Sequence, residues 1–539
     1  DREGTLVQFA YDYAGDCAAT ECTQLANRLA RVTYPLRDAE GGVSTGSRRY
    51  GYDARGRRIF HGMKWGDLDL AVSTAFDNRD RVTSRVFPGG KTVNRSYDAA
   101  GRLSEISGFI SDFEYTEQTM LKRLGYSNGA SIELTYDSIL RPKTLVSKDG
   151  AGGVIEQFEF DRDRMGGILT AKDMSGRTDR ADTSASYTYD AWYRLIQAEL
   201  AMDGEGAETL DYVFTHNDNV TSIVSSLGAD SVAHVGEVAY DAARPNAVSK
   251  AGSTDYAYNE MGQMVGRGGS EMTWDYLDRM TAHITSTDSY HYMYGEDEQL
   301  VALMGQDSLT FYGPEGFEFR DGIATTYVKN ERQRIGRHES LSLQAFMYPD
   351  VAPVGAPDQR ITAADAWAVL SGQDVTVPME AFAKPERVLG AAAARMLLDE
   401  ESGETTFLHF DHLGSITSAT TEGGEVRGER NFYPTGMVRF SEGYVDPYGF
   451  TGQEHMPDGM LRFAFRFLDP RVGRWASFDP AFLVVDVDAM ESLGEATTGY
   501  AYVANNFINS VDPLGLAGPG APSTPSGGTS SPPNRPQPS

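Results

Sequence analysis

The chain has 539 residues, and this length accommodates either several domains or one large repetitive one. Hydrophobic residues make up 40% and charged residues 23%, which is enough apolar material for a large core and excludes wholesale disorder. The 48 Lys and Arg against 77 Asp and Glu leave a net charge of −29, which argues against nucleic-acid binding as the main function. Since no run of 18 or more apolar residues occurs, the sequence predicts no membrane-spanning helix.

The first distinctive feature along the chain is its only pair of cysteines, Cys17 and Cys22. Two cysteines form neither a disulfide framework nor a four-ligand zinc site. A local disulfide and two free thiols both fit, so the pair does not identify the compartment. The chain starts at Asp1 without a methionine or a signal-like segment, which indicates a piece of a longer protein.

A repeat then runs through the first half of the chain. An aromatic residue is followed by Asp and, three or four residues later, often by Gly-Arg, and many copies start about 16–30 residues apart. An early copy at Tyr11-Asp12 is interrupted by the segment that holds the cysteines. The other copies begin at Tyr52-Asp53, Phe76-Asp77, Tyr97-Asp98, Tyr136-Asp137, Phe160-Asp161, Tyr189-Asp190, Tyr240-Asp241, Tyr258-Asn259 and Trp274-Asp275.

Each copy predicts the end of one strand, a tight turn and the start of the next strand. The aromatic residue ends a strand, and the Asp carboxylate accepts backbone N–H groups in the turn. Gly supplies a positive φ, and Arg or Leu opens the following strand. One hairpin cannot bury its apolar face, whereas a coil of hairpins can. The sequence therefore predicts a mainly β fold in which an antiparallel sheet winds around itself, with most Tyr-Asp pairs serving in turns and packing.

The composition changes between about residues 349 and 404. Thr362–Asp365 ahead of Ala366–Leu370 is typical of a helix start, and Pro385–Leu398 is a second helical run. We therefore expect a small helical insertion, whose function the sequence does not show. The predicted division of the chain is a repeat region at 1–348, the insertion at 349–404, a C-terminal core at 405–516 and a tail at 517–539.

The C-terminal core contains a dense series of motifs, and one of them superficially resembles a metal cluster. His409, Asp411 and His412 lie close in sequence, but on a strand the first two share a face and the third points away. We therefore predict no metal site and no cofactor. The other motifs are Phe450–Glu454, Arg466–Trp475, Ser477–Pro480 and Tyr500–Leu516.

The repeat series resembles the YD repeat of Rhs proteins, of the C components of insecticidal Tc toxins and of the teneurin shell. The end of the chain resembles the Rhs-associated core domain, whose DPxGL signature matches Asp512–Leu516. The resemblance implies a hollow β-shell made of one spiralling antiparallel sheet. In this family a variable toxin begins just past the signature. Residues 517–539 are instead a linker or tail rich in Pro, Gly and Ser, and no effector domain is recognisable there.

The resemblance also implies self-cleavage after Leu516, of the aspartic-protease kind. Carried over by motif, Asp479 and Asp512 are the candidate carboxylate pair, Arg466 is an orienting charge, and Asp469 is a weaker candidate. Leu516–Ala517 is the candidate scissile bond. Two carboxylates at close range cannot both ionise, so one keeps a proton and polarises the peptide carbonyl while the other activates water. Such an enzyme acts once, on its own chain.

Three observations weigh against active cleavage. Both Asp-Pro pairs are also good turn formers. Phe507 stands where the family usually has Pro, and the segment 480–499 is longer than usual.

The leading hypothesis is a shell that encloses a C-terminal toxin and releases it by self-cleavage. Its implied partners are this cargo, a delivery or secretion machinery and an immunity protein. Its implied location is secreted or cell-surface delivered, with a cytoplasmic stage before export. The alternative is a teneurin-like adhesion and interaction module without active cleavage.

Overall fold

The computed structural model describes residues 7–11, 28–37, 43–65, 68–88, 90–177, 183–202, 206–295, 299–306, 308–320, 323–330, 333–342, 403–444, 446–480 and 498–516. Cys17, Cys22 and Ala517 lie outside these residues, as do the tail and all of the predicted insertion except residues 403 and 404. The division of the chain at residues 348, 404 and 516 stays a prediction.

One antiparallel sheet of 34 strands makes up most of the molecule, and each strand pairs with the next one along the chain. Among the described residues β1 pairs only with β2 and β34 only with β33, so the sheet does not close on itself. The first 18 strands are β1 Gln8–Tyr11, β2 Leu29–Arg37, β3 Val43–Tyr52, β4 Arg58–Trp65, β5 Leu68–Phe76, β6 Val82–Val86, β7 Thr92–Tyr97, β8 Leu103–Ile106, β9 Ile110–Tyr115, β10 Leu121–Tyr126, β11 Ser131–Tyr136, β12 Pro142–Lys148, β13 Val154–Arg162, β14 Ile168–Asp173, β15 Ala185–Tyr189, β16 Leu195–Met202, β17 Gly206–Phe214 and β18 Val220–Ser225.

The second half of the sheet continues across the predicted insertion, because β31 pairs with β30. In the described ranges four short 3-10 helices accompany the strands: η1 Gly228–Asp230, η2 Pro314–Gly316, η4 Phe450–Gly452 and η6 Tyr502–Asn505. The strands are β19 Gly236–Tyr240, β20 Val248–Ala251, β21 Thr254–Tyr258, β22 Met264–Arg267, β23 Ser270–Trp274, β24 Met280–Ile284, β25 Ser289–Tyr294, β26 Leu300–Met304, β27 Leu309–Tyr312, β28 Phe317–Arg320, β29 Ile323–Lys329, β30 Arg334–Ser342, β31 Glu404–Phe410, β32 Ile416–Thr420, β33 Val426–Phe432 and β34 Val438–Gly443.

The repeat forms the turns that join the strands, as the copy at Tyr97 shows. Tyr97 ends β7, and the Asp98 carboxylate accepts the backbone N–H of Arg102 at 2.9 Å and its Nε at 2.7 Å. Gly101 has φ +88° and donates its N–H to the Asp98 carbonyl at 2.9 Å. The predicted roles of Asp and Gly in the turn are confirmed.

The tyrosine of several copies ties its hairpin to an earlier one. The Tyr97 hydroxyl donates to the Val82 carbonyl at 2.8 Å, and the Arg81 guanidinium lies 4.3 Å from the centre of the Tyr97 ring. This cation–π contact links consecutive turns along one edge of the sheet. The same bond from a tyrosine hydroxyl to an earlier strand recurs at Tyr52, Tyr115, Tyr136, Tyr189 and Tyr240.

One predicted copy of the repeat, at Phe160-Asp161, is placed two residues too early in the sequence. Strand β13 runs through Asp161, which lies opposite Thr170, and the turn begins two residues later at Asp163. Gly166, with φ +109°, supplies the positive φ, so its distance from Asp163 decides where the chain turns. Similar turns outside the copies of the predicted repeat follow Tyr115, Phe214, Phe410 and Phe432, and of these four only the one after Phe410 has Asp at the first turn position.

The positive-φ position of the turn is not always glycine, which predicts a stabilising substitution. Leu140 has φ +65°, a conformation that costs an L-residue with a Cβ about 1–2 kcal/mol. We expect Leu140→Gly to raise the free energy of unfolding by about 1 kcal/mol after the greater entropy of unfolded Gly is included. Gly101→Ala at the matching position should lower it by a similar amount. Denaturant titration measures both, and a lower stability of Leu140→Gly would contradict the strain argument.

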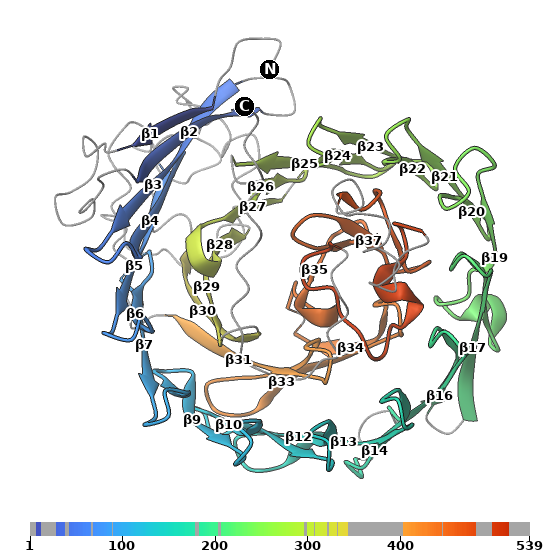
Figure 1. Cartoon of the computed structure of the whole chain (residues 1–539), viewed down its shortest axis with the longest axis horizontal. Helices are drawn as coiled ribbons and strands as arrows, with labels where there is room; N and C mark the ends of the chain where they lie inside the picture. The colour runs from blue at the N-terminus through green and yellow to red at the C-terminus, as the bar shows by residue number, and fades with distance from the viewer. Residues whose placement is uncertain are drawn as a thin grey trace, which may run out of the picture.

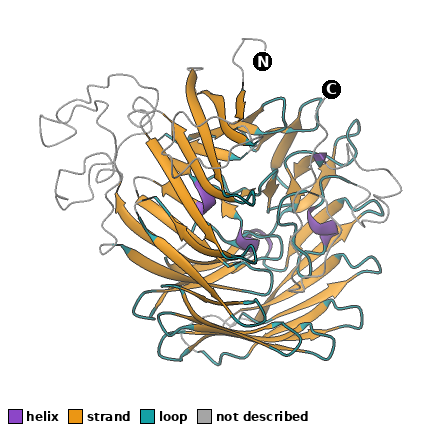
Figure 2. Ribbon diagram, turned by 60° about the vertical axis from the view of Figure 1, so that its left-hand side comes forward, coloured by secondary structure: helices purple, strands orange, loops and turns teal. Residues whose placement is uncertain are grey.

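The sheet rolls up so that its last strands lie inside its first ones (Figure 1). The Trp65 ring of β4 packs edge-on against Phe311 of β27 at 5.2 Å, and Ser147 of β12 bonds His409 of β31 at 2.6 Å. The buried core therefore lies largely between an outer and an inner layer of the same sheet. Figure 2 shows the strands forming a wall with loops at its rims. The predicted fold class, a spiralling antiparallel sheet that forms a shell, is confirmed.

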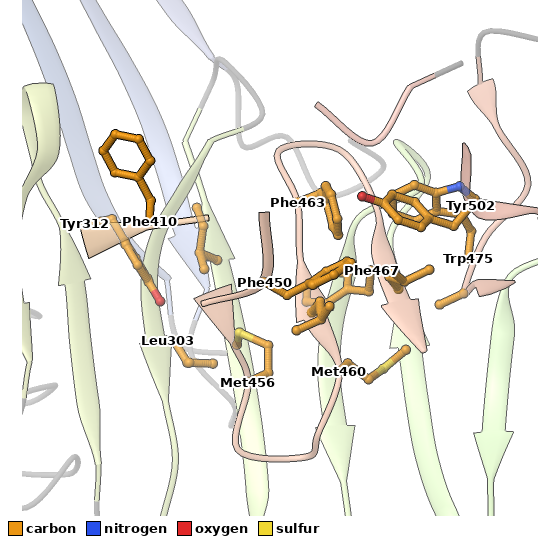
Figure 3. Packing of buried hydrophobic residues seen from close by; sticks show 14 of the residues in the cluster. Leu303, Tyr312, Phe410, Phe450, Met456, Met460, Phe463, Phe467, Trp475 and Tyr502 are labelled. Carbon is orange, nitrogen blue, oxygen red and sulfur yellow. The ribbon is translucent and has the colours of Figure 1, made fainter. Parts of the chain in front are cut away.

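After β34 the chain enters the space surrounded by the sheet (Figure 1). There it forms a small four-stranded sheet of β35 Glu454–His455, β36 Leu461–Arg462, β37 Phe467–Asp469 and β38 Arg474–Trp475. Figure 3 shows Phe450, Phe463, Trp475 and Tyr502 among the buried side chains of this C-terminal core. The core positions the predicted catalytic residues and Leu516, because all of them come from residues 466–516.

Candidate functional site

Arg466, immediately before β37, joins the two best carboxylate candidates. Its Nη2 lies 2.8 Å from Asp479 Oδ2 and 3.3 Å from Asp512 Oδ2. The exposed fractions of Arg466, Asp479 and Asp512 are 2%, 1% and 8%, so the group is buried. The structure thus brings three of the four predicted catalytic residues together, although Asp512 lies 46 positions from Arg466 in the sequence.

The Asp512 carboxylate also holds the backbone that leads to the predicted scissile bond. Its Oδ1 accepts the N–H groups of Leu514, Gly515 and Leu516 at 3.2, 2.9 and 3.1 Å. Gly515 has φ +75°, and a Cβ at this position would lie 2.9 Å from the Phe463 Cβ. Arg466 Nε donates to the Gly515 carbonyl. Leu516 is therefore fixed beside the paired carboxylates.

Asp479 is held through the backbone at residue 499. Its N–H donates to the Gly499 carbonyl at 3.1 Å, and the same carbonyl accepts Arg466 Nη1 at 3.3 Å. The segments carrying Asp479 and Gly499 therefore both contribute to the position of Arg466.

The charges in this group do not balance when all three side chains are ionised, because two carboxylates face one guanidinium. Burial raises the pKa of Asp512 above its usual value, although Arg466 and the three backbone N–H groups act in the opposite direction. One proton on the carboxylate pair makes the group neutral, which is the favourable state in a buried site. The arrangement therefore favours one ionised and one protonated carboxyl group.

Trp475 is a member of the site that the sequence reading did not select. The Arg466 guanidinium lies 4.0 Å from the centre of the Trp475 ring. Trp475 in turn packs edge-on against Phe463 at 4.8 Å and Tyr502 at 5.5 Å (Figure 3). This aromatic platform holds the guanidinium by a cation–π contact. The only sequence signal was the position of Trp475 inside the motif that contains Arg466.

Asp469 has partners other than the carboxylate pair. Its Oδ2 accepts the Tyr256 hydroxyl at 2.9 Å and lies 3.3 Å from Arg267 Nη1. Both partners belong to the wall, on β21 and β22, and Asp469 is fully buried. This carboxylate thus joins β37 to the surrounding sheet.

Phe507 and the two histidines have packing or hydrogen-bonding roles. Phe507 is 1% exposed and stacks on Tyr502 with ring centres 6.4 Å apart. His409 bonds the hydroxyls of Ser147 and Thr420, and His412 Nε2 lies 3.1 Å from the Ile508 carbonyl. Within the described ranges no group of three His, Cys, Asp or Glu side chains is arranged to hold a metal ion. In the same residues no helix has the length and apolar character needed to cross a membrane.

Comparison with solved structures identifies the architecture. The chain superimposes on the crystal structure of TcdB2-TccC3-Cdc42 with a TM-score of 0.68 and 15% identity, over 95% of this chain and 25% of that one. The Photorhabdus luminescens Tc holotoxin pore, with an aspartate-to-alanine substitution in TccC3, gives 0.67 and 14%, over 97% and 25%. The chain shares its fold, a YD-repeat shell, with these Tc toxin structures. This YD-repeat shell spans about a quarter of the length of those solved chains.

Sequence comparison connects part of the YD-repeat shell to a named toxin. The chain is 30% identical over 151 residues to double-stranded DNA deaminase toxin A of Burkholderia cenocepacia (strain H111). The match covers 26% of this chain and 10% of that protein, so it spans only a tenth of the relative's length. No protein-family model matches the sequence.

Proposed function

We propose that this YD-repeat shell encloses a toxin domain joined to its C-terminus and releases it by cutting its own chain at Leu516–Ala517. The observation that carries the proposal is the position of Asp512, which binds the Leu516 N–H with one oxygen and shares Arg466 with Asp479 through the other. The similarity to Tc toxin structures and to a deaminase toxin supports a toxin as the cargo.

The proposed reaction is hydrolysis of one peptide bond. Asp479 accepts a proton from a water molecule whose oxygen attacks the Leu516 carbonyl carbon. Asp512, protonated because of its burial, donates a hydrogen bond to the carbonyl oxygen. The C–N bond then breaks as the Ala517 nitrogen takes the proton that Asp479 accepted, so Ala517 leaves as a free amine and Leu516 carries the new carboxyl group.

The remaining candidates, Arg466 and Asp469, position the two carboxyl groups and do not act on the scissile bond directly. Arg466 sets the separation of the two carboxylates and stays charged throughout, since an arginine does not titrate at ordinary pH. Asp469 is the weaker candidate, through its attachment of β37 to the wall. Because the scissile bond is part of the same chain, a single turnover suffices and the effective concentration of substrate is very high.

The cargo and the route of delivery follow from the same similarity. A shell that surrounds a toxin protects the producing cell, and cleavage frees the toxin covalently while it stays enclosed. We extend the proposal to a delivery or secretion machinery as a partner, to an immunity protein against the cargo, and to action outside the producing cell.

A fusion that carries a folded reporter after Ser539 tests the proposal. We expect it to split during synthesis into a shell fragment and a reporter fragment, because the cleavage site needs no partner. Sequencing of the new N-terminus should read from Ala517. A fusion that stays intact, or that is cut at another bond, would contradict the proposal.

A further inference from the structure

The group formed by Arg466, Asp479 and Asp512 is linked to one repeat turn of the wall. This turn, Asn259–Gln263, joins β21 to β22 and has Asn in place of the usual Asp. Its Gly262 carbonyl accepts the Tyr500 hydroxyl at 2.7 Å, across 238 positions of sequence. The N–H of Met264, the next residue after the turn, donates to the Ala476 carbonyl at 2.7 Å.

Both contacts fall on the backbone segments that hold the carboxylate pair. Tyr500 follows Gly499, whose carbonyl accepts the Asp479 N–H and Arg466 Nη1. The Tyr500 carbonyl accepts the N–H of Trp475, the residue whose ring lies under Arg466. One buried tyrosine is thus a single residue away from the backbone contacts of Asp479 and Arg466.

The fit between the turn and Tyr500 leaves no spare room. Gly262 has φ +80°, and a Cβ added there would lie 2.5 Å from the Tyr500 hydroxyl oxygen. The Tyr500 ring is fixed on two further sides, because Phe478 and Tyr258 pack edge-on against it at 5.7 and 5.9 Å. Tyr258 itself is the aromatic residue of this repeat copy. The turn therefore determines where Tyr500 sits.

From these contacts we infer that Tyr500 is a positioning residue for cleavage and that the wall turn Asn259–Gln263 places it. This inference rests on the proposed self-cleavage. The carboxylate pair reaches its reactive arrangement only after the wall has wrapped around the core and the turn has met Tyr500. Cleavage then waits for the shell to assemble, so the cargo is cut free only when it is already enclosed.

The first test is Tyr500→Phe in the reporter fusion, followed by pulse labelling during cell-free synthesis. Loss of the hydroxyl should slow splitting about tenfold, because small displacements of reacting groups have large effects on rate. The pH profile of splitting should keep its shape, since no titrating group of the site has changed. Tyr136→Phe, which removes an equivalent hydroxyl bond to Leu121 in the outer wall, should split at the parental rate.

The second test uses the close approach of Gly262. Gly262→Ala should slow splitting more than Tyr500→Phe does, because its methyl group displaces the tyrosine. Combined with Tyr500→Phe, it should split faster than Gly262→Ala alone, since the clashing oxygen is gone. Gly101→Ala, at the same turn position with nothing closer than 3.4 Å, should not change the rate. If the two residues act independently, the double variant should instead split more slowly than either single variant.

The outcomes separate this inference from the proposed function. A parental fusion that stays intact overturns both. A parental fusion that splits, with Tyr500→Phe splitting at the same rate, overturns the positioning role alone. Slow splitting of Tyr500→Phe, together with recovery in the double variant, supports it.

Discussion

Replacement of either paired carboxylate is expected to leave the reporter fusion intact. Asp479→Asn and Asp512→Asn should each lower the splitting rate about a thousandfold or more, because an amide neither accepts the water proton nor donates the shared one. Asn keeps the Oδ1 acceptor for the N–H groups of Leu514, Gly515 and Leu516, so the turn should persist. Splitting is followed by gel electrophoresis, and folding by circular dichroism.

Two further variants make this test specific. Asp98→Asn in an ordinary repeat turn should split like the parent, because its carboxylate contacts only the turn. Asp469→Asn should have a smaller effect than the paired variants. If Asp469→Asn abolishes splitting while Asp512→Asn does not, then the assignment of Asp512 is wrong and the reacting pair includes Asp469. Normal splitting of both paired variants would mean that Asp479 and Asp512 are turn residues only.

The splitting rate of the parental fusion should depend on pH through the carboxyl group of Asp512. Burial raises the pKa of Asp512 above 3.8, so its proton is held over a wider pH range in the folded chain. Splitting should therefore slow as the pH rises through this raised value. The free energy of unfolding should change in the same direction. The contribution of protonated Asp512 is complete below pH 3.8 and is lost as the pH rises through the pKa of the folded chain. Asp512→Asn removes this loss and should not be less stable than the parent at high pH.

The second large effect is expected at a buried charge cluster that joins the core to the wall. Glu454, 1% exposed, contacts Arg320 of β28 at 2.5 Å and Arg462 of β36 at 2.6 Å, and it accepts the Tyr312 hydroxyl at 2.9 Å. Glu454→Ala leaves two half-buried arginines without this carboxylate. We expect the free energy of unfolding to fall by about 3–5 kcal/mol.

Denaturant titration of Glu454→Ala measures this loss. Glu114→Ala, which breaks an exposed ion pair with Lys122, is the matched control and should change stability by less than about 1 kcal/mol. The two arginines lower the pKa of Glu454 to about 2, so its contribution is present above pH 4.5 and is lost as the pH falls toward 2. Equal stabilities of the two variants at neutral pH would show that Glu454 does not hold the core in place.

The candidate site could be predicted in part. Asp479, Asp512 and Arg466 were identified because each lies in a recognisable motif, and the structure brings them together. Trp475 and Tyr500 were not selected, since an aromatic residue in a motif carries no sign that it supports a charge or meets a distant turn. The repeat copy at Phe160 was misplaced for a related reason, because a glycine three residues after Asp163 outweighed the aromatic-Asp pair at Phe160-Asp161.

The local units of this protein can be predicted from its sequence. Strand ends, turns and the pairing of each strand with the next all depend on residues a few positions apart, as between Asp98 and Arg102, so the pattern of side chains is enough to predict them. Three features depend on the folded structure as a whole. They are how far the sheet curls, which strands lie inside, and which wall turn meets the core. Those contacts join residues far apart in the sequence, such as Gly262 and Tyr500. They form because the apolar faces of the outer and inner layers of the sheet are buried against each other, and a short stretch of sequence does not reveal which residues will meet.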